Sequence, residues 1–376
     1  MLINMNIKKK VIVAMSGGVD SSVSAYLLLK QGYIVEGMFM KNWEEDDKNN
    51  FCSSSQDLSD TRLVCKKLGI ILHEVNFSEE YWNLVFEKFL LEHRKGKTPN
   101  PDILCNEKIK FGIFFNVAQK IFKADYIATG HYAQVKYFNK QPMLLRGLDS
   151  NKDQSYFLHR MTLNKLRKIL FPVGHLKKKT VRKIAQKINL PNANKKDSVG
   201  ICFIGSCKMK NFLSRFIKIK KGNIVNSDGY ILGIHHGLVN YTIGQRKGIG
   251  IGGISGKKKF PWYVIEKNLF KNTLVVCQGN KNIKLLSIGL IAIDVHWISM
   301  MNISNILYCT IKTRYQQKDI SGKIILISLN SVKIFFNTPI TSITPGQSVV
   351  FYMLDICLGG GFIKQPIFLS KDTYYT

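Results

Sequence analysis

Short apolar runs alternate with amphipathic stretches through the first two hundred or so residues. Three of these runs, at 9–16, 33–40 and 71–77, are short and rich in β-branched residues, as buried strands are. The stretches between them, 20–32 and 57–69, carry apolar residues at helical spacing and end in glycine. This alternation predicts an α/β domain with a parallel sheet, in which ligands bind at the carboxyl ends of the strands.

The pattern changes near residue 210, where short β-rich runs are separated by glycine, asparagine and proline turns. Such runs predict small antiparallel barrels appended to the first domain. We therefore expect three domains: an α/β domain at 1–209, a small central β-rich domain at 210–279 and a C-terminal β-barrel at 280–376.

A single cysteine stands in an unusual setting in TPNPDILCNEKIKF, residues 98–111. The prolines at 99 and 101 restrict the backbone before Cys105. Asn106 is a candidate N-cap for the apolar-periodic stretch that follows, which would put Cys105 beside a helix N-terminus. Such a position stabilises a thiolate. The alternative is a small, buried, unreactive side chain.

Composition excludes several classes of protein. Hydrophobic residues make up 45% of the 376 positions, yet no apolar run reaches the ~18 residues that span a membrane. The first ten residues lack the features of a signal peptide, so we expect a cytoplasmic protein. The eight cysteines form no CxxC pair, which argues against a protein-bound zinc or iron–sulfur cluster.

The chain carries 55 lysines and arginines against 25 acids, a formal net charge of +30. A field of this size attracts polyanions, and it favours nucleic-acid binding. Only nine of the basic residues are arginine, and the chain is also rich in isoleucine and asparagine. Codon bias toward A and T would produce the same mixture without any selection for a partner.

The motif AMSGGVDSS, residues 14–22, lies between the first predicted strand and the first predicted helix. Its glycines let the backbone turn around an anion, its serines offer hydroxyls, and the helix N-terminus adds free N–H groups. A Walker A sequence is absent. SGGxDS resembles instead the loop of enzymes that cleave ATP between its α and β phosphates. The alternative is a glycine turn that binds nothing.

A second cysteine, Cys202, stands in the small-residue segment DSVGICFIG. A thiolate can attack an activated carbon, and a persulfide can carry sulfur to it. With two thiols, one can deliver sulfur while the other completes its release by forming a transient disulfide, here between Cys105 and Cys202. Asp102 could serve as the general acid/base beside Cys105.

Ten segments occur together and in order: SGGVDSS, FMKNWEE, TPNPDILCNEKIKF, ATGHYA, KDQSYFL, DSVGICFIG, YTIGQRKGIGIGG, PWYVIEK, KTRYQ and TPGQSVVFY. In this combination the chain resembles the tRNA-specific 2-thiouridylase family from about residue 10 to 365. The resemblance implies a nucleotide-binding domain of the adenine nucleotide alpha hydrolase type, a small central β domain and a C-terminal β-barrel.

The resemblance also implies a reaction and its residues. ATP adenylates the carbon-2 oxygen of the wobble uridine, position 34 of tRNA, and a persulfide on Cys202 replaces that oxygen while Cys105 acts as the nucleophile. The implied ATP-binding residues are Ala14, Met15, Ser16, Gly17, Gly18, Val19, Asp20, Ser21, Met40 and Gly130. The implied tRNA-binding residues are Asn100, Pro101, Asp102, Lys152, Asp153, Gln154, Arg314 and Tyr315.

Partners and cofactors follow from the same resemblance. We expect ATP with Mg²⁺ bridged by its phosphates, tRNAs for Lys, Glu and Gln, and a sulfur-relay protein or cysteine desulfurase as donor. A monomer is expected. Tyr132, Tyr156 and Tyr315 are candidates to stack on the target base, or else core aromatics.

Three other functions remain open from the residues alone. A related adenylating ligase or amidotransferase would use the SGG loop without any cysteine. A non-enzymatic RNA-binding module would explain the charge. A thiol–disulfide oxidoreductase fits poorly, because Cys105 and Cys202 are far apart in the sequence.

Overall fold

The computed structural model describes residues 8–44, 53–197, 209–252, 260–280, 282–298 and 305–368. Contacts divide the chain into two compact units, each assembled from separated stretches. Unit 1 comprises Met1–Phe86, Pro101–Ser206 and Leu354–Leu358. Unit 2 comprises Glu87–Asn100, Cys207–Met353 and Gly359–Thr376.

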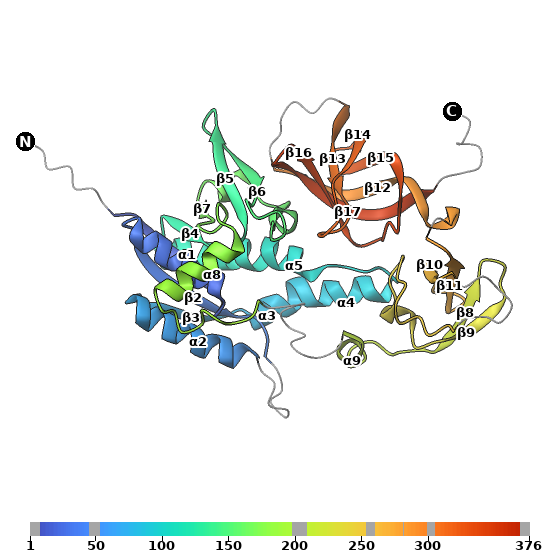
Figure 1. Ribbon diagram of the computed structural model, residues 1–376, viewed down its shortest axis with the longest axis horizontal. Helices are drawn as coiled ribbons and strands as arrows, with labels where there is room; N and C mark the ends of the chain where they lie inside the picture. Colours follow the sequence, from blue (N-terminus) through green and yellow to red (C-terminus); the bar gives the residue numbers. More distant parts are fainter. Residues whose placement is uncertain are drawn as a thin grey trace, which may run out of the picture. The chain divides into compact units, whose positions relative to one another are not determined.

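Unit 1 is organised around a parallel five-stranded sheet with the strand order β3-β2-β1-β4-β7. Figure 1 labels its strands β2, β3, β4 and β7. The central strand is the most buried, because its run of valine, isoleucine and alanine is covered on both faces. The strands are β1 (Lys10–Met15), β2 (Ile34–Lys41), β3 (Leu72–Asn76), β4 (Tyr126–Ala128) and β7 (Ile169–Leu170). The predicted parallel α/β sheet is confirmed.

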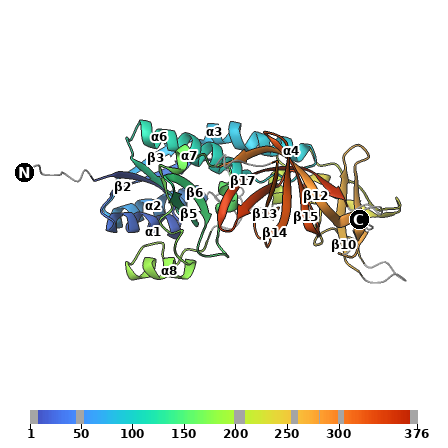
Figure 2. The same ribbon diagram turned by 90° about the horizontal axis from the view of Figure 1, so that it is seen from above.

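Helices lie on both faces of this sheet: α1 and α2 on one side and α6 on the other (Figure 2). One core joins β1, α1 and α8 through side chains such as Val11, Val23 and Val181. The helices outside the long runs described next are α1 (Val19–Lys30), α2 (Ser53–Leu68), η3 (Ser155–Leu158), α7 (Leu163–Leu166) and α8 (Lys178–Lys187).

Two long helical runs each contain wide π-helical turns. The first consists of α3 (Ser78–Tyr81), η1 (Trp82–Phe86) and α4 (Glu87–Arg94), and the second of α5 (Pro101–Leu104), η2 (Cys105–Ile113) and α6 (Phe114–Lys120). The prediction that Asn106 caps a helix is therefore wrong. The helix begins at Pro101 instead, where proline's missing N–H costs no hydrogen bond.

Unit 2 contains a small four-stranded sheet and most of a β-barrel. The sheet has the order β10-β11-β8-β9, and in the barrel β12 pairs with both β15 and β17. The elements are α9 (Met209–Leu213), β8 (Gly222–Asn226), β9 (Ile231–His235), η4 (Leu238–Asn240), β10 (Trp262–Asn268), β11 (Thr273–Gln278), η5 (Ile283–Leu285), β12 (Leu286–Trp297), β13 (Ile306–Lys312), β14 (Ile320–Ser328), β15 (Ser331–Thr341), β16 (Ser348–Met353) and β17 (Ile356–Phe368).

One hairpin of unit 1 receives a strand from much later in the chain. The hairpin is formed by β5 (Ala133–Phe138) and β6 (Gln141–Arg146). Ile356, at the start of β17, pairs with Leu145, and the Arg146 N–H donates to the Asp355 carbonyl. Unit 1 is thus completed by residues 354–358.

The predicted order of a nucleotide-type domain, a small β domain and a C-terminal barrel is confirmed, while the boundaries at 209/210 and 279/280 stay predictions. Among the described residues, no helix combines the length and apolar character needed to cross a membrane.

Candidate active site

The loop between β1 and α1 is shaped to receive an anion. Gly17 has a φ of +70°, and a Cβ there would lie 2.4 Å from the Asp57 carbonyl oxygen, so only glycine fits. Gly18 precedes the first residue of α1, and the Ser21 hydroxyl donates to its carbonyl at 3.0 Å. The Ser16 N–H in turn donates to Ser21 Oγ at 3.3 Å. The loop therefore holds one shape at a helix N-terminus.

The segment 129–132 lies directly against this loop. A Cβ on Gly130 would stand 2.7 Å from the Ser21 backbone nitrogen, which explains why this position lacks a side chain. The Tyr132 hydroxyl donates to Asp20 Oδ1 at 2.7 Å. Burial and the charge of Asp20 raise the pKa of Tyr132 well above its ordinary value, so the hydroxyl keeps the proton that it donates.

Lys178, in α8, supplies positive charge at the same place. Its ammonium contacts both carboxylate oxygens of Asp20 at 2.7 Å and one oxygen of Asp197 at 2.8 Å. Burial alone would raise the pKa of Asp197, but Lys152 and Lys178 outweigh it and hold that pKa well below its ordinary value. One lysine thus connects the glycine loop to the acid that lies five positions before Cys202 in the sequence.

Asn192 stabilises the glycine loop through two side-chain hydrogen bonds. Its side-chain amide donates to the Gly17 carbonyl at 2.8 Å and to Ser22 Oγ at 2.9 Å, and the residue is buried. Sequence reasoning missed both Asn192 and Lys178. The only available signal was the basic helix that contains Lys178, because no spacing rule links residues this far from the loop.

Cys105 lies inside the second helical run and is 3% exposed. The next residue fixes this run to the segment after β6, because the Asn106 side-chain amide donates to the Phe157 carbonyl at 3.1 Å. Asp102, one turn earlier, is half-buried, and burial raises its pKa above the ordinary value against the opposing effect of Lys110. A carboxyl with a raised pKa is a stronger base than an ordinary aspartate, which suits a group that accepts a proton.

His131 joins the cysteine helix to the anion loop. Its ring packs against Phe111 of η2 with a centroid distance of 5.8 Å, while its neighbours Gly130 and Tyr132 contact the loop. Burial, with help from Lys110, lowers the pKa of His131 well below its ordinary value, so the ring is neutral. Within unit 1, one four-residue segment therefore touches both the glycine loop and the helix of Cys105.

Family models match the chain in three consecutive parts. They are described as the tRNA methyl transferase HUP domain at residues 9–206, the tRNA methyl transferase PRC-barrel domain at 210–278 and the aminomethyltransferase beta-barrel domain at 287–363.

The curated relatives carry a different activity in their names. A tRNA-specific 2-thiouridylase MnmA from Buchnera aphidicola subsp. Acyrthosiphon pisum is 59% identical over 98% of this chain and 99% of its own length. The chain belongs to the tRNA-specific 2-thiouridylase family. A second family member, from Photorhabdus laumondii subsp. laumondii, is 54% identical over 96% of this chain and 99% of its own. The sequence-based family assignment is confirmed.

Solved structures add little to the thiouridylase assignment. NMN synthetase from Francisella tularensis aligns with a TM-score of 0.33 and 16% identity, covering 56% of this chain and 74% of that one. The family assignment rests on the sequence relatives.

The remaining residues that the thiouridylase resemblance implies for ATP lie in or near the loop. Met40 is half-buried near the end of β2, which is separated from β4 in the sheet by β1 alone. Val19 is the first residue of α1. Ala14 and Met15, at the end of β1, are buried. Their positions at the carboxyl ends of neighbouring parallel strands are those expected for a ligand site.

The segment of Lys152, Asp153 and Gln154 is tied down within unit 1. The Asp153 carboxylate is 4% exposed and accepts hydrogen bonds from Gly147 N and from both N and Oγ of Ser155. Gln154 accepts a hydrogen bond from the Tyr132 N–H. The side-chain oxygens of Asp153 and Gln154 thus accept hydrogen bonds from within unit 1, and these bonds fix the shape of the segment.

Two tyrosines that sequence reasoning offered as stacking partners are core residues. Tyr132 is 2% exposed and Tyr156 is 1% exposed, so neither ring presents a face to a base. Tyr315 is half-buried in unit 2. Asn100 and Arg314 also belong to unit 2, whereas Pro101 is the first residue of α5 in unit 1.

Two further expectations concern Cys202 and a metal ion. Cys202 lies outside the described residues, so its expected pairing with Cys105 stays a prediction. Within the described ranges, no group of three or more His, Cys, Asp or Glu side chains is arranged to hold a metal ion.

Proposed function

We propose that this chain is an ATP-dependent tRNA sulfurtransferase that converts the carbon-2 oxygen of the wobble uridine, position 34, to sulfur. One observation supports this most directly: the segment 129–132 contacts both the SGG loop and the helix of Cys105. A site that activates an oxygen with ATP and a site that carries a thiol are thus built on shared residues. The names of the relatives agree with this activity.

ATP is the first substrate. The loop N–H groups and the N-terminus of α1 suit its phosphates, and Lys178 stands where negative charge would build up on departing pyrophosphate. Mg²⁺ would be held by the ATP phosphates and Asp20, and it would neutralise phosphate charge. Lys178 would then exchange its contact with Asp20 for one with phosphate.

The chemistry runs in two stages. The carbon-2 oxygen of uracil attacks the α-phosphorus of ATP, pyrophosphate leaves, and the oxygen becomes part of a good leaving group. The terminal sulfur of a persulfide on Cys202 then attacks carbon 2, and AMP leaves with that oxygen.

Cys105 completes the transfer. Its thiolate attacks Sγ of Cys202 and breaks the sulfur–sulfur bond, so that the outer sulfur remains on the base and a Cys105–Cys202 disulfide forms. A thiol reductant must supply two electrons before the next turnover. Asp102 accepts the proton of Cys105, and the raised pKa of its carboxyl suits that role.

The remaining assignments extend this proposal to the partners. Asn100, Pro101 and Asp102 would contact the target base, and Lys152, Asp153, Gln154, Arg314 and Tyr315 the rest of the tRNA. The buried Asp153 would act by fixing the shape of its loop. The substrates would be tRNAs for Lys, Glu and Gln, a sulfur-relay protein or cysteine desulfurase would load Cys202, and the enzyme would act as a cytoplasmic monomer.

Alanine variants of three cysteines test the proposal. Cys202→Ala and Cys105→Ala should each lower thiolation of unmodified tRNA by a factor of about 10³ or more while ATP still binds. Cys65→Ala is the matched control, because burial raises the pKa of the Cys65 thiol to about 11 and keeps it unreactive. The readout is mass spectrometry of nucleosides from tRNA incubated with protein, ATP and a persulfide donor.

The other functions make different predictions in this assay. An adenylating ligase would keep full activity without Cys202, with ammonia or an amine in the product. An RNA-binding module would release no AMP when tRNA and ATP are added. Either result would overturn the sulfurtransferase proposal.

A further inference from the structure

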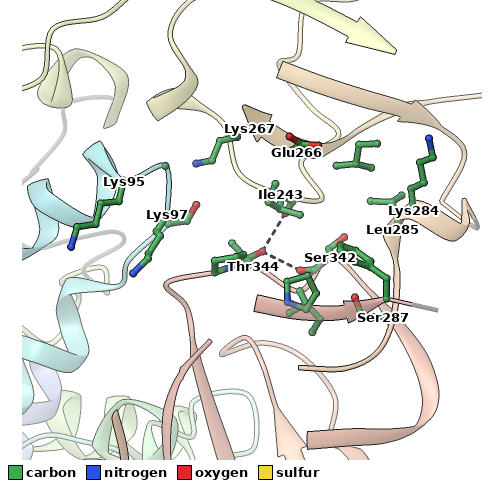
Figure 3. A pocket seen from close by; sticks show the side chains of 17 residues that line it. Lys95, Lys97, Ile243, Glu266, Lys267, Lys284, Leu285, Ser287, Ser342 and Thr344 are labelled. Carbon is green, nitrogen blue, oxygen red and sulfur yellow. Dashed lines mark hydrogen bonds between the residues drawn. The ribbon is translucent and has the colours of Figure 1, made fainter. Parts of the chain in front are cut away.

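Unit 2 contains a cavity of about 310 Å³ that the proposed reaction does not use. Its walls come from the turn after α4, from β10, from η5 and the start of β12, from the loop 342–345 and from the end of β17 (Figure 3). All of these residues belong to unit 2. The volume is at the lower end of the roughly 300–1,000 Å³ found for small-ligand pockets, which suits one ring system with its attached groups.

Two of the walls come together where the backbone of Gly244 lies against the Ser342 side chain. Gly244 has a φ of +80°, and a Cβ there would lie 2.1 Å from the Ser342 hydroxyl oxygen, so this position requires glycine. The Thr98 N–H donates to the Pro345 carbonyl at 3.1 Å, and the Gln347 side chain donates to the Thr98 carbonyl. Residues 95–98, 243–244 and 342–345, which are far apart in the sequence, therefore meet around this cavity within unit 2.

Arg314 fastens two of the walls to each other. Its Nη2 donates to the carbonyls of Ile243 and Ser342, both at 3.0 Å, and to Thr344 Oγ1 at 2.9 Å. The Thr344 hydroxyl contacts the same two carbonyls (Figure 3). The guanidinium of Arg314, one of the residues proposed to contact tRNA, thus also shapes the lining of the cavity.

The lining combines apolar walls with positive charge. Ile243, Ile265 and Leu285 are among its apolar members. Lys95 and Lys97 lie at one end of the cavity, where they pair with Glu92, and Lys284 lies at the other end (Figure 3). The Lys284 ammonium has no hydrogen-bond or ion-pair partner among the described residues.

Lys267 adds a fourth lysine to the lining, against one acid, Glu266. Its ammonium donates to the Tyr241 carbonyl at 2.9 Å. Burial lowers the pKa of Lys267 to about 8, so a nearby anion would stabilise its charged form.

From this arrangement we infer that the cavity binds one unstacked nucleotide of the RNA substrate. The base packs between the apolar walls, and the flanking phosphates lie at the lysines. Unstacked bases are the parts of folded RNA that proteins bind in pockets, and lysine contacts to phosphate supply salt-dependent affinity. The inference rests on the proposed function, because it takes tRNA to be the substrate.

A cavity-filling variant tests whether a base packs between the apolar walls. Ile265→Trp should weaken the binding of an unmodified tRNA transcript about tenfold, because it occupies the space of the base. Ile231→Trp is the matched control: it lies on β9 of the same small sheet, 65% exposed and outside the lining. Both proteins would be compared with wild type by filter binding at fixed salt, after their melting temperatures show that they fold.

A charge variant tests whether the lysines contact phosphates, and it leaves the apolar walls unchanged. Lys284→Ala should weaken tRNA binding and make the slope of log affinity against log salt concentration shallower by about one. Lys364→Ala, exposed on β17 and outside the lining, should leave that slope unchanged.

The outcomes separate this inference from the proposed function. If wild type thiolates tRNA but Ile265→Trp and Lys284→Ala bind it as wild type does, the cavity inference is wrong and the proposed function stands. If those two variants lose affinity for adenosine 5′-monophosphate and keep it for tRNA, the occupant is a free nucleotide and the RNA inference is overturned. If wild type neither binds nor thiolates tRNA, the proposed function fails.

Discussion

Lys178 links two carboxylates that belong to different parts of unit 1, the Asp20 of the glycine loop and Asp197. Replacing it by methionine keeps the length of the side chain and removes its charge. Lys178→Met should lower tRNA-dependent release of AMP by about 10² or more, because a cation aimed at developing phosphate charge is lost.

Lys183→Met is the matched control for that measurement. Lys183 lies on the same helix and is exposed, so its loss should leave AMP release within twofold of wild type. Equal rates for wild type and Lys178→Met would show that Lys178 has no part in the adenylation site.

The residues of the site differ in how far the sequence revealed them. The SGG loop could be predicted because its glycines and serines are adjacent, and a local motif encodes a local shape. Lys178 and Asn192 could not, because their roles depend on contacts with residues more than 150 positions away. Tyr132 and Tyr156 were ambiguous, since only burial decides whether an aromatic ring is a core residue or an exposed one.

The helical run from Pro101 to Lys120 shows a similar limit for an element. The sequence predicted a helix here, but it placed the N-cap at Asn106, whereas the helix begins at Pro101. Asparagine is a common N-cap, but the Asn106 side chain donates to the Phe157 carbonyl instead. No local sequence pattern predicts a contact between residues this far apart. The π-helical turns of η2 were also not predicted, because such turns are rare and no pattern in the sequence marks them.

Asn106 should consequently matter for the stability of this run. Asn106→Ala removes the donor to the Phe157 carbonyl in a buried setting, and it should lower the free energy of unfolding by about 1–3 kcal/mol. The control is Asn116→Ala on the exposed face of α6, where the change should stay within about 0.5 kcal/mol. Urea denaturation followed by circular dichroism measures both, and equal midpoints would contradict the assigned role.

For the molecule as a whole, the charge of +30 leaves two explanations, RNA binding or codon bias. If about six or more phosphates are contacted, tRNA affinity should fall by about 10³ between 50 and 200 mM salt. ATP affinity measured over the same range should change far less, because a loop and a few side chains hold it. A tRNA affinity that hardly varied with salt would assign the lysine excess to codon bias.

The architecture of the whole molecule was predictable in outline, because alternating strands and helices and short β-rich runs are visible in the hydrophobic pattern. What the pattern could not reveal is the exchange of segments between the two compact units. That exchange depends on pairings such as Ile356 with Leu145, which lie far apart in the sequence.

This pairing has a consequence for protein synthesis. The β5–β6 hairpin leaves the ribosome long before its partner at 354–358 has been translated. Until then, the edge of β6 at Leu145 and Arg146 lacks these backbone partners and is open to pairing with other nascent chains. We therefore expect the newly made polypeptide to depend on chaperones during this interval, and a ribosome stalled before codon 354 to present an aggregation-prone intermediate.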